Sequence, residues 1–259
     1  MPRIKPKNKP HRAAAKRNIS QPGKLPIIGT TREKPAKAKR VAQAVGKGAD
    51  PKRVTAILRK LDEAYPRANC ELKHENAFQL LISTILSAQT TDVRVNEVTP
   101  QLFRKYPSPQ ALAAAHPQEV EQEIRPTGFF RNKTKSILGA SKALIENFGG
   151  QVPRTMDEML TLPGVARKTA NVVLGTAYGI PSGVVVDTHV MRLSRRLDLT
   201  RHEDPKKIEE DLMRVIPKEK WIIFSHQLIW HGRRVCIARK PKCLECNLES
   251  LCYSKDKII

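Results

Sequence analysis

The chain has 259 residues and a formal charge of +22 at neutral pH, from 47 Lys and Arg against 25 Asp and Glu. This length can bury a substantial core, and this charge indicates an acidic polymer as the partner. No stretch approaches the roughly 18 consecutive apolar residues of a membrane-spanning helix, and the N-terminus lacks an apolar secretory segment, so we expect an intracellular protein that does not bind membranes.

The first 49 residues differ in composition from the rest of the chain. They contain fourteen Lys or Arg and a single acid, Glu33, which accounts for +13 of the formal charge and leaves +9 for the remainder. Large apolar residues are few there, so we interpret residues 1–50 as a disordered basic arm. The arm either tethers the protein to DNA through counterion release or only aids solubility. It is rich in Lys and Pro and has one Ser, which is not the composition of an organellar transit peptide.

Apolar residues follow a helical spacing from Pro51 onward. One stripe lies directly after the arm and a second ends at Gly149-Gly150; their members are Val54, Ile57, Leu58, Leu61 and Tyr65, and Ile137, Leu138, Leu144, Ile145 and Phe148. Strand signals are scarce, because the best candidate, Val184-Val185-Val186, is too short to imply a sheet. The spacing predicts an all-α protein with eight to eleven short helices.

Two further segments have the form of helix starts. Thr155 and Glu158 stand three residues apart, as in a capping box. Asp204-Pro205 places a capping carboxylate before a proline at the first helical position. We therefore expect a helix to begin after Thr155 and another after Asp204.

A glycine-centred turn, Leu162-Pro163-Gly164-Val165-Ala166, precedes a helical run that includes Lys168. Such a turn presents backbone N–H groups at a helix N-terminus, where a DNA phosphate is favoured. Lys168 is then either a phosphate-binding residue, which is the commoner use of a lysine, or a nucleophile. The second role needs a neutral amine, and the adjacent Arg167, the helix N-terminus and partial desolvation favour that form.

Asp187 follows the apolar run of three valines and precedes the periodic residues Val190, Leu193 and Leu197. This is an N-cap position, for which a structural role is usual. With a lysine nearby, the carboxylate has a second use, since it can stabilise a cationic sugar-like transition state or move a proton.

Four cysteines lie close together near the C-terminus, in the spacing Cys236-x6-Cys243-x2-Cys246-x5-Cys252. In an intracellular protein this indicates metal ligation rather than disulfides. Four thiolates hold either a [4Fe–4S] cluster or a zinc ion. Zinc sites usually pair two short knuckles, and only one is present here, so the spacing favours iron–sulfur over zinc.

The loop between the first two of these cysteines carries three cations, Arg239, Lys240 and Lys242. A bound metal would make this loop rigid, and a rigid basic loop can bind phosphates with little loss of entropy. The alternative is that the metal only staples the C-terminal region. We expect both roles.

Five motifs occur together in one order: LSAQTTD (86–92), LPGVARKTANVVL (162–174), VDTHV (186–190), HGRRVCIARKPKC (231–243) and the four-cysteine spacing. From about Lys52 to the C-terminus the chain thereby resembles the endonuclease III family of base-excision-repair DNA glycosylases, within the helix-hairpin-helix superfamily. The resemblance implies a two-lobed, all-α helix-hairpin-helix fold with a C-terminal [4Fe-4S] cluster loop. A six-helix lobe would span 70–182, and a discontinuous cluster lobe would combine 51–69 and 183–259.

The resemblance also implies an activity, that of a bifunctional DNA glycosylase and AP lyase. After a damaged base is flipped out of the duplex, Lys168 would attack the sugar C1′ and Asp187 would stabilise the oxocarbenium-like transition state. β-Elimination would then cleave the strand 3′ to the abasic site. Oxidised pyrimidines are the implied substrates, in double-stranded DNA with damaged bases or abasic sites. The protein would act as a monomer in a bacterial-type cytoplasm, associated with the nucleoid.

The same resemblance implies a set of DNA contacts. Gln89 would fill the gap left by the flipped base and Phe129 would act as a wedge on the opposite strand; without the family, Gln89 is an ordinary residue at a helix end and Phe129 a core residue. The backbone would be held by the hairpin and the basic loop, through Gly164, Val165, Ala166, Arg167, Arg239, Lys240 and Lys242. Ala166 replaces a family glycine, which argues against a left-handed backbone there.

Two other functions are compatible with parts of the pattern. A mismatch-adenine glycosylase of the same superfamily has a glutamate at the position of Thr84 and no lysine at that of Lys168. A non-catalytic DNA-binding module would use the hairpin, loop and arm only to bind phosphates.

Among the histidines, we expect His189 near the site in a structural hydrogen bond, and His226 and His231 as hydrogen-bonded packing residues.

Overall fold

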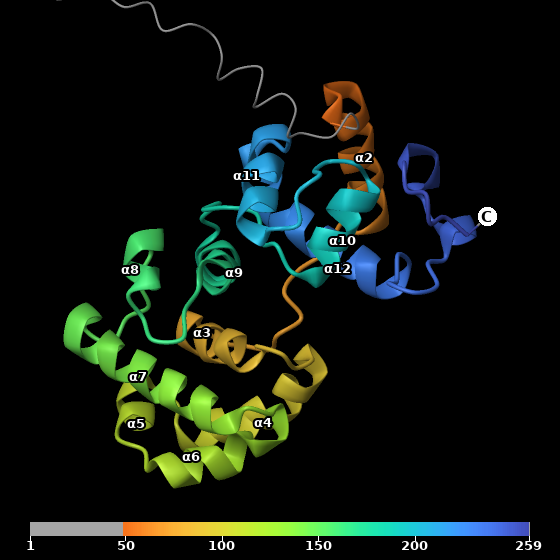
Figure 1. The fold of residues 1–259 in the computed structure, drawn as a ribbon. Coiled ribbons are helices and arrows are strands. Elements are labelled where there is room, and N and C mark those ends of the chain that lie inside the picture. The colour runs from red at the N-terminus through yellow and green to blue at the C-terminus, as the bar shows by residue number, and fades with distance from the viewer. Residues whose placement is uncertain (1–48, 259) are drawn as a thin grey trace, which may run out of the picture. The chain divides into compact units, whose positions relative to one another are not determined.

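The computed structural model describes residues 49–258, so residues 1–48 of the predicted basic arm lie outside the described residues. The described part contains eleven α-helices, four 3-10 helices and no strand, which confirms the all-α prediction (Figure 1). The α-helices are α2 (Pro51–Ala64), α3 (Ala77–Leu86), α4 (Asp92–Lys105), α5 (Pro109–Ala113), α6 (Pro117–Ile124), α7 (Phe130–Phe148), α8 (Met156–Leu160), α9 (Arg167–Tyr178), α10 (Thr188–Arg196), α11 (Pro205–Val215) and α12 (Trp221–Arg234).

Three helices begin with a capping side chain before a proline, as the sequence predicts for Asp204. Asp50, Ser108 and Asp204 each precede a proline, and each side chain accepts a hydrogen bond from the backbone N–H three residues later, at 3.0, 3.2 and 3.0 Å. Proline costs no hydrogen bond at the first helical position, because a backbone N–H there has no acceptor inside the helix. The starts of α2, α5 and α11 are thus determined by residues adjacent in the chain.

The Thr155 cap and the glycine stop form as predicted, whereas the Glu158 carboxylate binds the Thr155 hydroxyl and not the Thr155 N–H of a full capping box. The Glu158 N–H donates to Thr155 Oγ1 at 3.3 Å, and the Thr155 hydroxyl donates to the Glu158 carboxylate at 2.7 Å. Helix α7 ends at Gly149, whose φ of +57° is the left-handed conformation that glycine adopts without steric cost.

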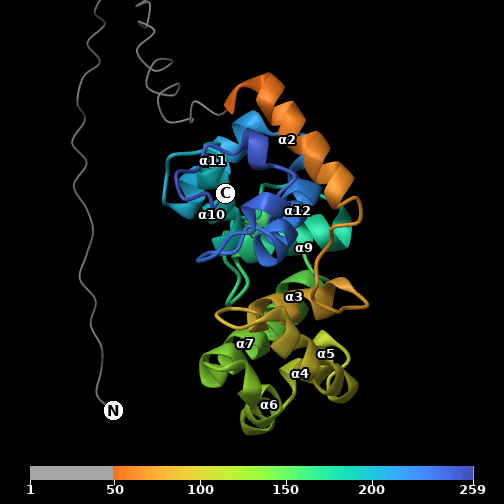
Figure 2. The same ribbon diagram turned by 90° about the vertical axis from the view of Figure 1, so that its right-hand side faces the viewer.

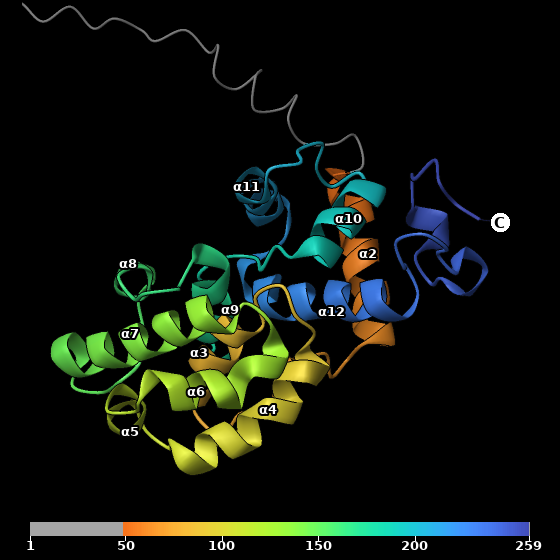
Figure 3. The same ribbon diagram turned by 60° about the horizontal axis from the view of Figure 1, so that its bottom comes forward.

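Buried apolar side chains form one cluster within residues 72–174. Helix α7 lies along α5 and α6, and α3 packs against both α7 and α9 (Figures 1 and 3). Ile137 and Leu144 of the predicted stripe are fully buried. The prediction is wrong for Ile145, which is 37% exposed, because it points about 100° away from Leu144 around the helix and so leaves the packed face.

A second cluster of buried apolar side chains combines residues 54–61 with residues 184–248. Here α12 packs against α2 and α10, and α10 packs against α11 (Figure 2). Because the buried residues separate into these two groups, we propose that the chain forms two lobes with the predicted limits, 70–182 and 51–69 with 183–259.

The three valines 184–186 form no strand, although all three residues are buried. The Val185 N–H donates instead to Ser225 Oγ on α12 at 3.0 Å, so a side chain replaces the missing strand partner. This bond fixes the backbone that leads into α10.

None of the helices in residues 49–258 is long and apolar enough to cross a membrane.

Candidate active site

The predicted hairpin lies between α8 and α9. Gly164 has φ of +76°, and the Val165 N–H donates back to the Leu162 carbonyl at 3.1 Å. Ala166 is the N-cap of α9 with φ of −98° and ψ of 169°, an extended backbone that any residue can adopt. The hairpin therefore needs glycine at 164 and not at 166. The Val165 N–H is occupied within the turn and the Val165 side chain is buried.

Replacing Gly164 by alanine is expected to lower the free energy of unfolding by about 2–3 kcal/mol, from left-handed strain and a steric clash. A Cβ atom there would lie 2.6 Å from Cβ and 2.8 Å from Oγ of Ser136. Gly179→Ala is the matched control, because Gly179 has φ of +66° with nothing within 4 Å of the added atom, so only the backbone cost of about 1 kcal/mol applies. Urea denaturation of both variants measures the difference, and equal losses would contradict the clash.

Lys168 is the second residue of α9 and its side chain is exposed. Within the described residues it makes no hydrogen bond and no ion pair, so its amine is free to meet a ligand. The adjacent Arg167 differs, because its Nε donates at 2.8 Å to Glu209, a carboxylate that is only 5% exposed. Asn171 Nδ2 holds the other oxygen of Glu209 at 2.8 Å. Arg167 thus anchors the start of α9. The carboxylate of Glu209 compensates the positive charge of Arg167, which weakens the repulsion between Arg167 and Lys168.

Asp187 is the N-cap of α10, as predicted. Its Oδ1 accepts hydrogen bonds from the N–H groups of His189 and Val190, both at 2.8 Å. Its Oδ2 has no hydrogen-bond partner in the described part of the chain. One oxygen of the carboxylate therefore holds the helix and the other is available for chemistry.

The structure brings Lys168 and Asp187 to the same two adjoining cavities. The first, here called the inner pocket, has about 530 Å³ of empty space, and the second, the outer groove, has about 1380 Å³. Both are lined by Glu71, Ser87, Asp92, Lys168, Asp187 and Arg233. Gln89 and His189 line the outer groove only. His189 lies in the predicted place and its Nδ1 contacts Arg192 at 3.2 Å.

The two residues predicted to enter the DNA share an unusual backbone conformation. Gln89 has φ of 55° and Phe129 has φ of 47°, values that are costly for residues other than glycine. Both side chains are exposed, and Phe129 is 64% exposed. The assignment of Phe129 to the core from its residue type alone is therefore wrong. A buried lysine that sequence reasoning missed, Lys133, supports this loop by donating to the Thr127 carbonyl at 2.7 Å.

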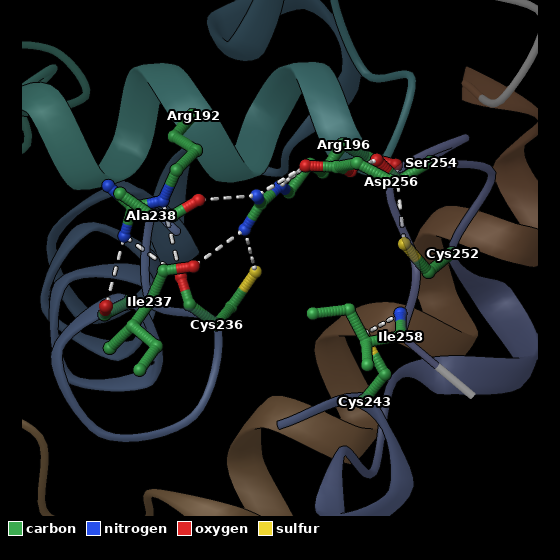
Figure 4. Close-up of polar contacts among 11 residues, drawn as sticks. Arg192, Arg196, Cys236, Ile237, Ala238, Cys243, Cys252, Ser254, Asp256 and Ile258 are labelled. Carbon is green, nitrogen blue, oxygen red and sulfur yellow. Dashed lines mark hydrogen bonds and ion pairs between the residues drawn. The ribbon is translucent and has the colours of Figure 1, made fainter. Parts of the chain in front are cut away.

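The four clustered cysteines line a cavity of about 340 Å³, with no disulfide among them. No group of three or more His, Cys, Asp or Glu in the described residues is arranged to hold a metal ion. Arg196 of α10 donates to Cys236 Sγ at 3.2 Å (Figure 4). The Ile258 N–H lies 3.4 Å from Cys243 Sγ.

The basic loop between Cys236 and Cys243 is held by α10. Arg196 donates to the carbonyls of Ile237 and Ala238, each at 3.0 Å, and pairs with Asp256 (Figure 4). The side chains of Arg239, Lys240 and Lys242 are exposed, and Lys242 lies 3.7 Å from a carboxylate oxygen of Glu245. Neither these cations nor Phe129 line the two cavities at Lys168. Sequence reasoning missed Arg196, because nothing in the local pattern of α10 indicates its partners.

The two histidines of α12 behave differently. His231 is hydrogen-bonded as predicted, with Nδ1 2.9 Å from the Tyr65 hydroxyl and Nε2 3.4 Å from Cys246 Sγ. The prediction is wrong for His226, which is 8% exposed and has no hydrogen-bond partner within residues 49–258. It lines the inner pocket.

Burial, together with the positive charge of Arg233, lowers the pKa of His226 to about 4. The folded protein thus keeps this ring neutral, whereas the unfolded chain binds a proton below about pH 6.5. Stability linked to His226 is complete above pH 6.5 and is lost as the pH falls from 6.5 to 4, by at most about 3 kcal/mol. We expect His226→Phe to remove this part of the pH dependence. Urea denaturation at pH 7 and 4.5 tests it, and parallel pH curves for the two proteins would contradict it.

Comparison with known proteins defines the class to which this fold and site belong. The family model described as "HhH-GPD superfamily base excision DNA repair protein" matches residues 82–218. In structure, the chain is similar to "Structure of a Trapped Endonuclease III-DNA Covalent Intermediate: Estranged-Adenine Complex", with a TM-score of 0.75, 45% identity and coverage of 79% of this chain and 96% of that one. A thermostable thymine-DNA glycosylase, at 24% identity and a TM-score of 0.69, shares the fold.

Closer similarities in sequence are to proteins named endonuclease III. That of Synechocystis sp. is 58% identical over 202 residues, covering 78% of this chain and 92% of that protein. That of Bacillus subtilis is 47% identical over 207 residues, covering 80% and 94%. The chain therefore belongs to the endonuclease III family of the HhH-GPD superfamily. Its function is that of a DNA glycosylase with AP lyase activity in base excision repair.

Proposed function

We propose that Lys168 and Asp187 are the catalytic pair of this enzyme. The observation that carries the proposal is that Lys168, on α9, and Asp187, at the start of α10, line the same pocket and the same groove. In the proposed reaction, neutral Lys168 Nζ attacks the sugar C1′ while the bond from C1′ to the base breaks and the base leaves with the electron pair. The free oxygen of Asp187 stabilises the positive charge that develops on the sugar.

The covalent intermediate then proceeds to strand cleavage. Loss of a proton from the attacking amine and opening of the sugar ring give a Schiff base between Lys168 and C1′. Removal of a proton from C2′ expels the 3′ phosphate by β-elimination, which cleaves the strand 3′ to the abasic site. Asp187 Oδ2 is suited to assist the proton transfer from the amine, since its other oxygen already satisfies the helix N-terminus.

The proposed partner is double-stranded DNA with a damaged base or an abasic site. Gln89, on the rim of the outer groove, would replace the extruded base, and the exposed Phe129 would enter the stack on the other strand. The hairpin at Gly164, Ala166 and Arg167 and the basic loop at Arg239, Lys240 and Lys242 would hold phosphates, whereas the Val165 N–H is already bonded within the turn. We further propose that the enzyme acts as a monomer in a bacterial-type cytoplasm, where its +22 charge favours association with the nucleoid.

For the cofactor we propose a [4Fe-4S] cluster held by Cys236, Cys243, Cys246 and Cys252. These four thiols line one cavity, and their spacing contains only one short Cys-x2-Cys pair, which favours an iron–sulfur cluster over a zinc ion. When bound, the cluster would make the basic loop rigid, and none of the proposed steps of base removal uses it.

Metal analysis of the purified protein is expected to find iron and inorganic sulfide in equal amounts. Cys243→Ser is expected to lose both, because it removes one of the four thiolates. Cys70→Ser is the matched control and should retain them, since Cys70 packs against the other apolar cluster. Stoichiometric zinc without sulfide would overturn the assignment.

The activity and its lesion range are tested together by borohydride trapping over a panel of duplexes. We expect a covalent adduct with abasic-site DNA and with duplexes that carry an oxidised pyrimidine, and none with undamaged DNA. A wild-type protein that forms no adduct with abasic-site DNA would overturn the lyase mechanism. Adducts with abasic-site DNA alone would overturn the proposed lesion class and leave the lyase intact.

A further inference from the structure

Helix α12 forms part of the wall of the inner pocket. Four residues of this helix line it, namely His226, Ile229, Trp230 and Arg233. The pocket adjoins the outer groove, because Lys168, Asp187 and four other residues line both cavities. A group that enters the pocket beside the proposed catalytic pair is therefore within a cavity that α12 also lines.

His226 is the polar residue of this wall that the fold leaves unsatisfied. Its polar neighbours on α12 each make at least one hydrogen bond: Ser225 with Val185 and Trp221, Gln227 Nε2 with Asp62, and His231 with Tyr65, although Gln227 Oε1 has no partner in the described part of the chain. His226 is only 8% exposed, and in residues 49–258 neither ring nitrogen has a hydrogen-bond partner. The ring nitrogens are not among the fully buried unpaired atoms, and His226 lines the pocket, so a ligand in the pocket can reach them.

The charges nearest to His226 on α12 are already paired, and among the described residues the unpaired charges of the lining belong to the proposed catalytic residues Lys168 and Asp187. Arg233 is bound by Glu71 and by Asp92, the latter at 2.8 Å. The Thr84 hydroxyl donates to the Leu80 carbonyl at 2.7 Å. His226 itself is neutral at neutral pH, because burial and Arg233 lower its pKa to about 4. The ring thus offers one N–H donor and one nitrogen acceptor to a neutral molecule.

The rest of the lining adds flat apolar contact. Leu72, Val172, Val185 and Ile229 contribute side chains to the same pocket. Apolar walls with one neutral donor and acceptor match a planar ring whose edge carries amide-like N–H and C=O groups. A pyrimidine base has such an edge. Within residues 49–258 the lining offers a phosphate a single unpaired cation, Lys168, which the proposed function assigns to the sugar C1′.

We propose that His226 binds the polar edge of the base extruded into the inner pocket and is a specificity-determining residue of base removal. This inference rests on the proposed function, because it requires a flipped base at Lys168. It concerns the glycosylase step alone, since an abasic site has no base to bind.

The test compares two single-turnover rates in each variant: excision of an oxidised pyrimidine and strand cleavage at a preformed abasic site. His226→Phe keeps a flat ring and removes both hydrogen-bonding nitrogens. We expect its ratio of excision to cleavage to fall by about 5- to 100-fold, the loss expected for a hydrogen bond made to the substrate. His116→Phe is the matched control, because His116 caps α6 outside both cavities, and its ratio should equal that of the wild type.

A second variant keeps the proposal testable if His226→Phe does not fold. His226→Gln retains one donor and one acceptor at different positions, so we expect the relative rates across several damaged pyrimidines to change by more than about 5-fold. An unchanged ratio in His226→Phe, or unchanged relative rates in His226→Gln, would overturn the inference. Failure of the proposed function is distinguishable, since it appears as a wild-type protein that forms no adduct with abasic-site DNA.

Discussion

Alanine at position 168 is expected to abolish the covalent adduct that borohydride traps between this protein and abasic-site DNA. The adduct requires an amine that forms a Schiff base, and the exposed Lys168 is the lysine that lines both cavities at Asp187. Trapping yields are measured on denaturing gels against the wild type. Lys142→Ala is the matched control, because Lys142 is an exposed lysine of α7 outside these cavities, and it should be trapped normally.

Arginine at the same position separates the nucleophile from a phosphate-binding lysine. Lys168→Arg keeps the positive charge, whereas the guanidinium does not lose its proton in proteins and forms no Schiff base. We expect binding of abasic-site DNA to remain within a few-fold of the wild type and trapping to disappear. A trapped adduct in Lys168→Arg, or normal trapping in Lys168→Ala, would assign the chemistry to another residue.

Replacement of Asp187 by asparagine is expected to lower the single-turnover rate of base excision by about 10²- to 10⁴-fold, the range for a positioned acid–base group. The fold should persist, because the Asn side-chain oxygen can accept the same two hydrogen bonds from His189 and Val190. Excision rates and urea denaturation are measured on the same preparation.

Alanine at position 187 provides the contrast for this variant. Asp187→Ala removes the cap as well as the charge, so it should also lower the free energy of unfolding by about 0.5–2 kcal/mol. If Asp187→Asn excised bases at the wild-type rate, the carboxylate would have only its structural role.

The starts and ends of helices could be predicted because the groups that determine them are adjacent in the chain. Asp50 and Asp204 reach N–H groups three residues away, and Gly149 adopts its left-handed backbone without help from the rest of the fold. The same local logic identified Asp187 as an N-cap. It was wrong for Ile145, since residue type and spacing alone do not say where the packed face of a helix ends.

The order of motifs along the chain was sufficient to single out Lys168 and Asp187 as candidates. Whether the two residues meet depends on packing, because Lys168 lies on a helix of the first apolar cluster and Asp187 precedes a helix of the second. The exposure of Phe129 is a similar case. Its residue type favours burial in the core. In the structure its backbone is left-handed, the buried Lys133 donates a hydrogen bond to the Thr127 carbonyl of the same loop, and the Phe129 side chain lies at the surface.

The sequence by itself determined the helical class, several helix starts, the end of α7, the family resemblance and the two proposed catalytic residues. Tertiary structure alone decided the long-range contacts of the site and of the cysteine loop. Glu209 pairs with Arg167, Arg196 donates a hydrogen bond to the cysteine loop, and His226 lines the inner pocket without a partner among the described residues. The physical reason is distance along the chain. Arg167 and Glu209 lie 42 residues apart, and Arg196 and Ile237 lie 41 apart, so these contacts come from packing between helices and leave no periodic or local signal in the sequence.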